Sequence, residues 1–312
     1  MSAISSEIPD NVLFLIELTD AYSWRNLIDY LRCSNTEGNF IFSKKEISYK
    51  AIDGQNYLLN HVKIKTHKLF RWIFNSESDI LVGIQLTEMQ SNTKNIGKKD
   101  GMRMYLKPND PNIYMQILST TKGPRGNISF VKTREIDFLD YEPPEYLRPK
   151  DEPNSIAIIS DFAKTCKMLS SVKCDYVILQ GYPKGVKMSA YLEGHLVGKS
   201  ESFGTCEDAV SSTTKLPDIR SIVLNMPDVD PNMNVSGKKV KILLRPVEGI
   251  PTIRVPSSII GYLSKTNNTS QNGIVMMYLE DGKPARFVFP VGYYGKLSIY
   301  IRDQTVSMTG DK

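Results

Sequence analysis

The sequence predicts an α+β protein of two similar halves, each an antiparallel sheet with two helices, joined by an extended connector. Most segments alternate apolar and polar residues as strands do, and four short stretches have helical periodicity. The order of helices and strands also repeats after about 140 residues, which indicates an internal duplication. The predicted units are residues 1–136, a connector at 137–153, a second domain at 154–302 and a tail at 303–312.

The first half contains two predicted helices. One begins after Asp20, whose side chain can cap the first turn. The inward residues of this helix are Trp24, Leu27, Ile28 and Leu31, and the outward ones are Arg25, Asp29 and Arg32. The other helix is predicted from Thr87 to about Ile96 and ends at Gly97, a residue suited to the position after a helix.

The second half repeats this arrangement. Its first helix is predicted to begin at Ser160 and to expose Lys164 and Lys167 together on its outer side. Its second helix is predicted to open at Pro256, because proline suits the first helical position, and to expose Lys265. The apolar residues assigned to the core from these two helices are Phe162, Cys166, Leu169, Ile259, Ile260 and Leu263.

Strand alternation recurs in both halves. Ile47, Tyr49 and Ala51 share one side of a strand, and the same pattern returns about 140 residues later. The further alternating segments are Met102–Leu106, Ile113–Ile117, Val186–Ala190, Val240–Leu244, Ile274–Tyr278 and Leu297–Ile301. The second half has about 30 extra residues between its helices, which we assign to the polar, turn-rich segments at 203–221 and 228–237.

Composition excludes several classes of protein. Hydrophobic residues make up 41% and charged residues 23% of the 312 residues, which excludes a disordered or collagen-like chain. The 39 basic and 34 acidic residues leave a net charge of +5, too small an excess to select a partner. The four cysteines form no C-x-x-C pair, which favours a reducing compartment. The apolar run Val12–Ile16 is too short for a signal peptide or a membrane span, so we expect a protein that is not secreted.

No catalytic or metal-binding motif is visible. The three histidines are scattered, and no nucleophile elbow, phosphate loop or dinucleotide fingerprint occurs. Asp228–Asn232 begins like a calcium loop, but Met233 and Lys239 occupy the positions that need glycine and glutamate. We therefore expect neither enzymatic activity nor a cofactor. A metal-dependent nuclease is the remote alternative, and it would require acidic residues that converge on strands.

Four stretches together resemble the proliferating cell nuclear antigen (PCNA) class of DNA sliding clamps, over almost the whole chain. The stretches are Ile47–Asp53, Ile84–Gly101, Ser160–Val172 with Gly185–Ala190, and Gly295–Tyr300. The resemblance implies two domains, each a curved antiparallel sheet with two helices. It also implies that three subunits close head-to-tail into a ring whose helices line a channel for duplex DNA. Such a ring tethers a polymerase through phosphate contacts that read no sequence.

The resemblance assigns DNA-binding positions to the outer faces of all four helices. Ser91 stands where the family has a further basic residue. The matching cations and their basic neighbours are Arg25, Arg32, Lys94, Lys98, Lys99, Lys164, Lys167 and Lys265. The alternative reading of each is an ordinary solvated cation on a helix surface.

The resemblance also assigns a client-binding pocket beside the connector. In the family this pocket accepts a short peptide motif, a helical turn with apolar and aromatic anchors. The matching residues are Ile52, Leu59, Phe138, Leu139, Pro284 and Tyr300. Their alternative reading is that they fill the space between sheet and connector. The matching subunit-interface edges are strands near Ser129–Arg134 and His195–Phe203.

Several features depart from the cellular clamps. Those clamps are usually acidic, whereas this chain is basic and has insertions in both halves. Such divergence favours a protein of a large DNA virus, located in the nucleus or at a cytoplasmic viral replication site. The expected partners are double-stranded DNA, a DNA polymerase and other clients, and two further copies of the chain, with no membrane. The alternatives of the same fold are a monomeric or dimeric processivity factor and a scaffold for viral transcription.

Overall fold

The computed structural model describes residues 9–119, 123–137, 152–192, 195–206, 250–269 and 273–304. The helices are α1 (Ala21–Ser34), η1 (Thr66–Lys68), α2 (Leu86–Thr93), α3 (Ile159–Ser171), α5 (Ser257–Leu263) and η2 (Ser264–Asn268). The first-half strands are β1 (Phe14–Leu18), β2 (Glu37–Phe42), β3 (Glu46–Ile52), β4 (Leu58–Lys65), β5 (Arg71–Phe74), β6 (Ile80–Gln85), β7 (Asp100–Leu106), β8 (Asn112–Ser119) and β9 (Gly123–Arg134). The second-half strands are β10 (Ser155–Ile158), β11 (Tyr176–Tyr182), β12 (Lys184–Leu192), β13 (His195–Thr205), β14 (Thr252–Pro256), β15 (Ile274–Tyr278), β16 (Ala285–Val291) and β17 (Gly295–Ile301).

All four predicted helices are present, with differences at their ends. Asp20 caps α1 as expected, since its carboxylate accepts the Ser23 amide at 3.1 Å and the Ser23 hydroxyl at 2.6 Å. α2 ends at Thr93, before the predicted Ile96, because the Gly97 amide donates to the Asp100 carboxylate at 2.9 Å and the chain turns there. The prediction that α5 opens at Pro256 was wrong by one residue. Pro256 is held extended by pairing with Tyr176, so the helix begins at Ser257.

The duplication predicted from the sequence appears in the strand order. In the first half the strands lie in the orders β6-β2-β3-β4 and β9-β8-β7-β1. In the second half the corresponding orders are β14-β11-β12-β13 and β17-β16-β15-β10. Each half therefore has the same two antiparallel meanders. The predicted strand at Val240–Leu244 lies outside the described residues.

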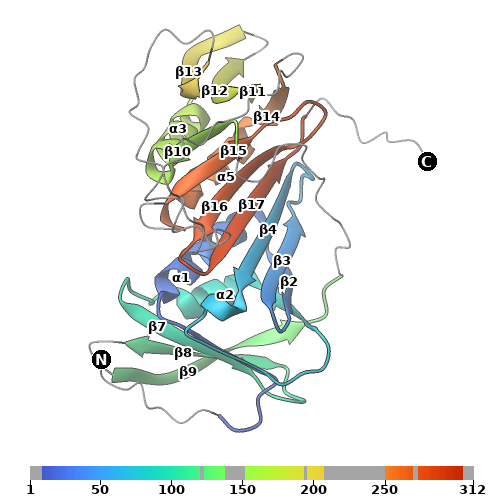
Figure 1. Ribbon diagram of the computed structural model, residues 1–312, viewed down its shortest axis with the longest axis vertical. Coiled ribbons are helices and arrows are strands. Elements are labelled where there is room, and N and C mark those ends of the chain that lie inside the picture. Colours follow the sequence, from blue (N-terminus) through green and yellow to red (C-terminus); the bar gives the residue numbers. More distant parts are fainter. Residues whose placement is uncertain are drawn as a thin grey trace, which may run out of the picture.

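One strand pair joins the two halves into a continuous sheet. β17, the last strand of the second half, runs antiparallel to β4 of the first half, from Gly295 opposite Ile64 to Ile301 opposite Leu58. In Figure 1 these strands cross the middle of the elongated molecule. Seven cross-strand partners make this junction part of the sheet rather than a loose contact between domains.

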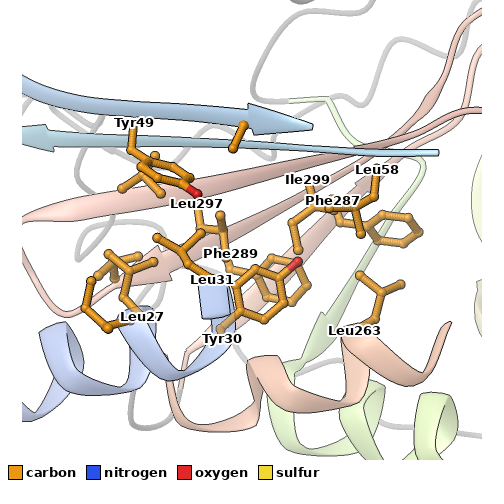
Figure 2. Close-up of a cluster of buried hydrophobic side chains, with 14 of the residues drawn as sticks. Leu27, Tyr30, Leu31, Tyr49, Leu58, Leu263, Phe287, Phe289, Leu297 and Ile299 are labelled. Carbon is orange, nitrogen blue, oxygen red and sulfur yellow. The ribbon is translucent and has the colours of Figure 1, made fainter. Parts of the chain in front are cut away.

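The core between helices and sheet is shared by both halves. Figure 2 shows Leu27, Tyr30 and Leu31 of α1 packed toward Phe289 and Leu297 of the second half, with Leu263 of α5 alongside. The predicted inward residues of α1 and α3 are all buried. The helices are therefore fixed against one side of the sheet, and their polar residues are left on the outer side.

A buried ion pair crosses β1 and β7 on the side of the sheet that faces away from the helices. Glu17 lies opposite Arg103, whose Nε donates to the Glu17 carboxylate at 2.7 Å, and both side chains are buried. Arg71 lies on the other side of Glu17 at 3.5 Å. This pair lets the charged Arg103 be buried within β7, whose residues are all buried.

Candidate nucleic-acid and partner interfaces

The four helices form one layer that runs across both halves. α1 contacts α2 on one side and α5 and η2 on the other, and α3 contacts α5 and η2. The Arg25 guanidinium donates to the Ile96 carbonyl at 2.9 Å, and the Gln90 amide donates to the Asp29 carboxylate at 2.8 Å. These hydrogen bonds fix α2 and its following turn against α1.

Most of the predicted DNA-binding cations are exposed on this layer. Lys164 is 80% exposed, and its amine lies 3.6 Å from Asp161 on the same helix. The other exposed cations of the predicted set are Arg32, Lys94, Lys98, Lys99, Lys167 and Lys265. Ser91, which replaces a family cation, donates its hydroxyl to the Thr87 carbonyl at 2.9 Å.

Arg25 differs from the other cations. Besides its bond to the Ile96 carbonyl, it lies 3.7 Å from Asp29 and 5.8 Å from the Tyr22 ring centre. Its side chain is 31% exposed, much less than that of Lys164. Arg25 therefore braces α1 against the turn after α2, a role that the sequence prediction missed.

Cys33 shows that cations from both halves meet on one surface. Burial raises the pKa of the Cys33 thiol, while Lys265 and then Arg32 lower it through their positive charge. Arg32 lies in the last turn of α1, in the first half, and Lys265 lies in η2, in the second half. Both charges are therefore close enough to act on the same sulfur atom at the end of α1.

The described acidic residues of the helices are each paired with a cation. Asp29 lies beside Arg25, and Asp161 lies beside Lys164. Glu88 lies 3.3 Å from Arg134 of β9. The remaining exposed cations give the outer side of the layer a positive charge that a polyanion would complement.

The predicted client-pocket residues lie on the opposite side of the sheet from the helices. Ile52 is the cross-strand partner of Leu59, which is the partner of Tyr300. Tyr300 is in turn opposite Arg286, and Arg286 is opposite Tyr278. We call these five residues the outer row. Leu59 and Tyr300 are almost fully buried, Ile52 is partly exposed, and Pro284 immediately precedes β16.

The sequence prediction missed two members of the outer row. The Arg286 guanidinium lies 4.9 Å from the ring centre of Tyr278 and 5.9 Å from that of Tyr300. A cation held over aromatic faces in this way is stabilised by their electron density. The signal in the sequence was a charged residue at the second position of an apolar strand, but only strand register places it between the two rings.

The chain leaves the first half on this outer side of the sheet. The Asn39 amide donates to the Ile136 and Asp137 carbonyls at 3.1 and 3.0 Å. A side chain at Gly83 would collide with the Arg134 carbonyl and the Ile136 side chain, so glycine permits this close passage. Phe138 and Leu139, the connector members of the predicted pocket, lie outside the described residues.

The two predicted interface strands have open edges. β13 is an end strand of the four-stranded sheet. β9 pairs with β8 along most of its length, and its described pairing with β6 is limited to Thr133 and Arg134. In Figure 1, β9 and β13 lie toward opposite ends of the long axis. Phe130 of β9 is 60% exposed and Ile128 is 51% exposed.

A shallow groove accompanies the open edge of β9. It has a volume of about 510 Å³ and lies between α2 and β9. The Asn92 amide donates to the Phe130 carbonyl at 2.9 Å, so this carbonyl points away from β8. The groove is lined by Thr87, Glu88, Ser91, Asn92, Phe130 and Lys132.

Within the described segments, no group of three histidine, cysteine or acidic residues could hold a metal ion. The calcium-like segment Asp228–Asn232 lies outside them. All four cysteines are described, and all are free thiols. No helix in the described part of the chain is long and apolar enough to span a membrane.

Comparison with solved structures identifies the fold. A crystal structure of proliferating cell nuclear antigen from Entamoeba histolytica superposes with a TM-score of 0.69 at 14% identity, covering 94% of this chain and 99% of that one. A PCNA2–PCNA3 complex from Sulfolobus tokodaii gives a TM-score of 0.65 at 14% identity, covering 93% and 99%. No family model and no curated protein matches the sequence itself. This similarity, together with the repeated topology, shows that the chain has the fold of the PCNA-type clamps.

Proposed function

We propose that this chain, which has the PCNA-type clamp fold, is a DNA sliding clamp that holds a DNA polymerase and other clients on duplex DNA. The observation that carries the proposal is the helix layer. Helices from both halves present exposed cations on one side, and the acidic residues among them are paired. Cations at many points on a smooth layer would bind phosphates without reading the sequence.

The internal duplication supports our proposal that the chain assembles into a closed ring. β17 and β4 pair where the two halves meet, and their counterparts in the repeat are β9 and β13. Both of these counterparts have open edges. If β9 of one copy pairs with β13 of the next, every junction has the same form and head-to-tail closure removes the open edges. We propose three copies, as the resemblance to the clamp family implies.

The outer row is the proposed binding site for clients. It lies on the side of the sheet that faces away from the helices, so a client would not compete with DNA for the same surface. Ile52 supplies partly exposed apolar surface, while Leu59 and Tyr300 form the buried floor. An apolar anchor of a client peptide could bind on this floor and also contact the predicted pocket residues Phe138, Leu139 and Pro284.

A topological experiment tests this function. The protein is placed on nicked circular DNA with a loader or by dilution from mild denaturant, and the complex is isolated by gel filtration at high salt. A ring is expected to stay on the circle, because salt weakens phosphate contacts but does not open a closed ring. Linearising the DNA with a restriction enzyme should release it. Equal loss from circular and linear DNA would contradict a ring and would favour a non-ring processivity factor of the same fold.

A further inference from the structure

Three turns come together at one end of the strands β3, β4 and β17. The outer row lies at the other end of these strands. The Lys44 carbonyl accepts hydrogen bonds from the Thr66 hydroxyl at 2.9 Å and from the Trp72 indole at 3.2 Å. The Thr66 amide donates to the Lys45 carbonyl, and the Lys65 amide donates to the Tyr294 carbonyl. These bonds tie the turns at residues 43–46, 65–70 and 292–295 into one surface.

This surface combines positive charge with exposed aromatic rings. Phe70 is 59% exposed and is not one of the buried core residues. Tyr293 is 41% exposed. We call the surface the basic rim, and its members are Lys44, Lys45, His67, Lys68, Phe70 and Tyr293.

The nearby acidic residues offset only part of this charge. Glu46 lies 3.4 Å from Lys63, so its carboxylate is already paired. Glu77 and Asp79 are exposed on the adjacent loop between β5 and β6. Lys296 follows the β16–β17 turn, whereas the charge of Arg71 is paired with Glu17 at 3.5 Å.

The basic rim lies at one end of the helix layer. The Tyr293 hydroxyl is 2.8 Å from the Thr19 hydroxyl, and the Tyr294 hydroxyl donates to the Asp20 carbonyl, so the rim borders the start of α1. The β16–β17 turn lies beside α1 in Figure 1. At the other end of α1, the Asn35 amide donates to the Ile52 carbonyl in the outer row. β4 runs from the outer row to the basic rim, and a strand of this length spans roughly 25 Å.

We propose that the basic rim binds single-stranded DNA where it leaves the passage lined by the helices. This inference rests on the proposed clamp function. Lysines attract the phosphates, and exposed rings give unpaired bases a surface on which to stack, which is how proteins bind single strands without sequence preference. A duplex buries its base faces within its own stack, so Phe70 and Tyr293 should favour single strands. The rim is separate from the outer row, so a client and the single strand could bind together.

Fluorescence anisotropy on the full chain tests the proposal. One probe is an oligothymidylate of about 16 nucleotides, long enough for several bases to stack, and the other is a duplex of the same length. Phe70→Ala should weaken oligothymidylate binding by about fivefold or more, the effect of losing one stacked base. The same variant should change duplex affinity by less than about twofold, because the duplex offers no free base face. Lys44→Ala with Lys45→Ala should weaken oligothymidylate binding and reduce its salt dependence.

Matched controls separate this proposal from general effects. Leu81→Ala removes an equally exposed apolar side chain from β6, and Lys184→Ala removes an exposed cation from the second half. Neither should alter oligothymidylate binding. Unchanged oligothymidylate affinity in Phe70→Ala, or an equal loss on both probes, would overturn the proposal. Lys164→Ala with Lys167→Ala tests the helix layer independently, because it should weaken the duplex complex whether or not the rim binds single strands.

Discussion

Arg25 and Lys164 illustrate how two cations with the same sequence pattern acquire different roles. Both occupy the polar face of an amphipathic helix, and both are predicted DNA-binding cations. Arg25 is engaged with the Ile96 carbonyl and with Asp29 and is 31% exposed, whereas Lys164 lies near Asp161 of its own helix and is 80% exposed. The pattern shows which face is polar, but the neighbouring helix decides which cations remain available for DNA.

The first prediction compares these residues. Lys164→Ala with Lys167→Ala should lower affinity on every duplex alike and reduce the salt slope by up to about two, one for each lost phosphate contact. Arg25→Ala should instead lower the free energy of unfolding by about 1 kcal/mol, the usual effect of losing one partly exposed hydrogen-bonded side chain. Binding titrations at several salt concentrations and urea unfolding measure the two effects. Unchanged affinity and slope in the lysine variant would show that these lysines are ordinary solvated charges.

The second prediction concerns Cys33, which lies beside Arg32 and Lys265. Cys166 is fully buried and burial raises its pKa, whereas Cys33 is only partly buried. A maleimide should therefore modify Cys33 first, and the rate should rise with pH because the thiolate is the reactive form. Saturating duplex should slow the reaction, since DNA would cover this end of α1. Mass spectrometry of timed samples measures both effects, and Cys33→Ser is the control. A rate that duplex does not change would place DNA elsewhere.

At the scale of elements, the edge strands determine how the chain can assemble. The repeat gives β9 the position that β17 has in the second half, but β17 is covered by β4 while β9 is open. Phe130 and Ile128 project from this open strand as exposed apolar residues. An open strand with apolar side chains favours pairing with another chain.

The third prediction tests this edge. Phe130→Glu should give a folded monomer, because the side chain is largely exposed in one chain and would be buried against β13 of the next. Sedimentation should give three times the chain mass of 35.3 kDa for the original protein and the single-chain mass for the variant. Leu81→Glu introduces the same charge at another exposed apolar position and should leave assembly intact. A trimeric Phe130→Glu variant would exclude β9 as the interface.

At the scale of the whole molecule, the sheet separates two surfaces, which we propose bind DNA and clients. The helices and their cations lie on one side, and the outer row lies on the other. The outer row gathers residues from β3 and β4 of the first half and from β15, β16 and β17 of the second, which are distant in sequence but lie in one sheet. If the proposed clamp function holds, a change in the outer row acts on clients without touching DNA.

The fourth prediction uses this separation. Ile52→Ala with Leu139→Ala should abolish stimulation of the client polymerase while DNA binding and assembly persist, since a few central apolar contacts usually dominate an interface. These positions suit the test better than Tyr300, whose almost complete burial would add a cost in stability. Primer-extension assays measure stimulation, and Leu81→Ala is the control. Full stimulation by the folded double variant would place the client site elsewhere.

The fold class, the four helices and the internal repeat could be predicted from the amino-acid sequence. These features depend on local patterns: the Asp20 cap, the spacing of Leu27 and Leu31, and the alternation of Ile47, Tyr49 and Ala51. Such patterns act through nearby residues along the chain, so they can be read without knowing what the chain packs against. The segments at 129–134 and 195–203 lie on strands as the sequence predicts, and their role as subunit interfaces stays a prediction.

Roles that depend on partners distant in sequence became visible in the folded chain. There Arg25 contacts the turn after α2. Arg286 lies between Tyr278 and Tyr300, and Glu17 is buried with Arg103. The turns that carry Lys44, Thr66 and Tyr294 are joined into one rim. Each of these contacts results from strand register or helix packing, which brings together residues that no local pattern relates. Local periodicity sets the face on which a side chain lies, and the packing of separate elements sets what it meets there.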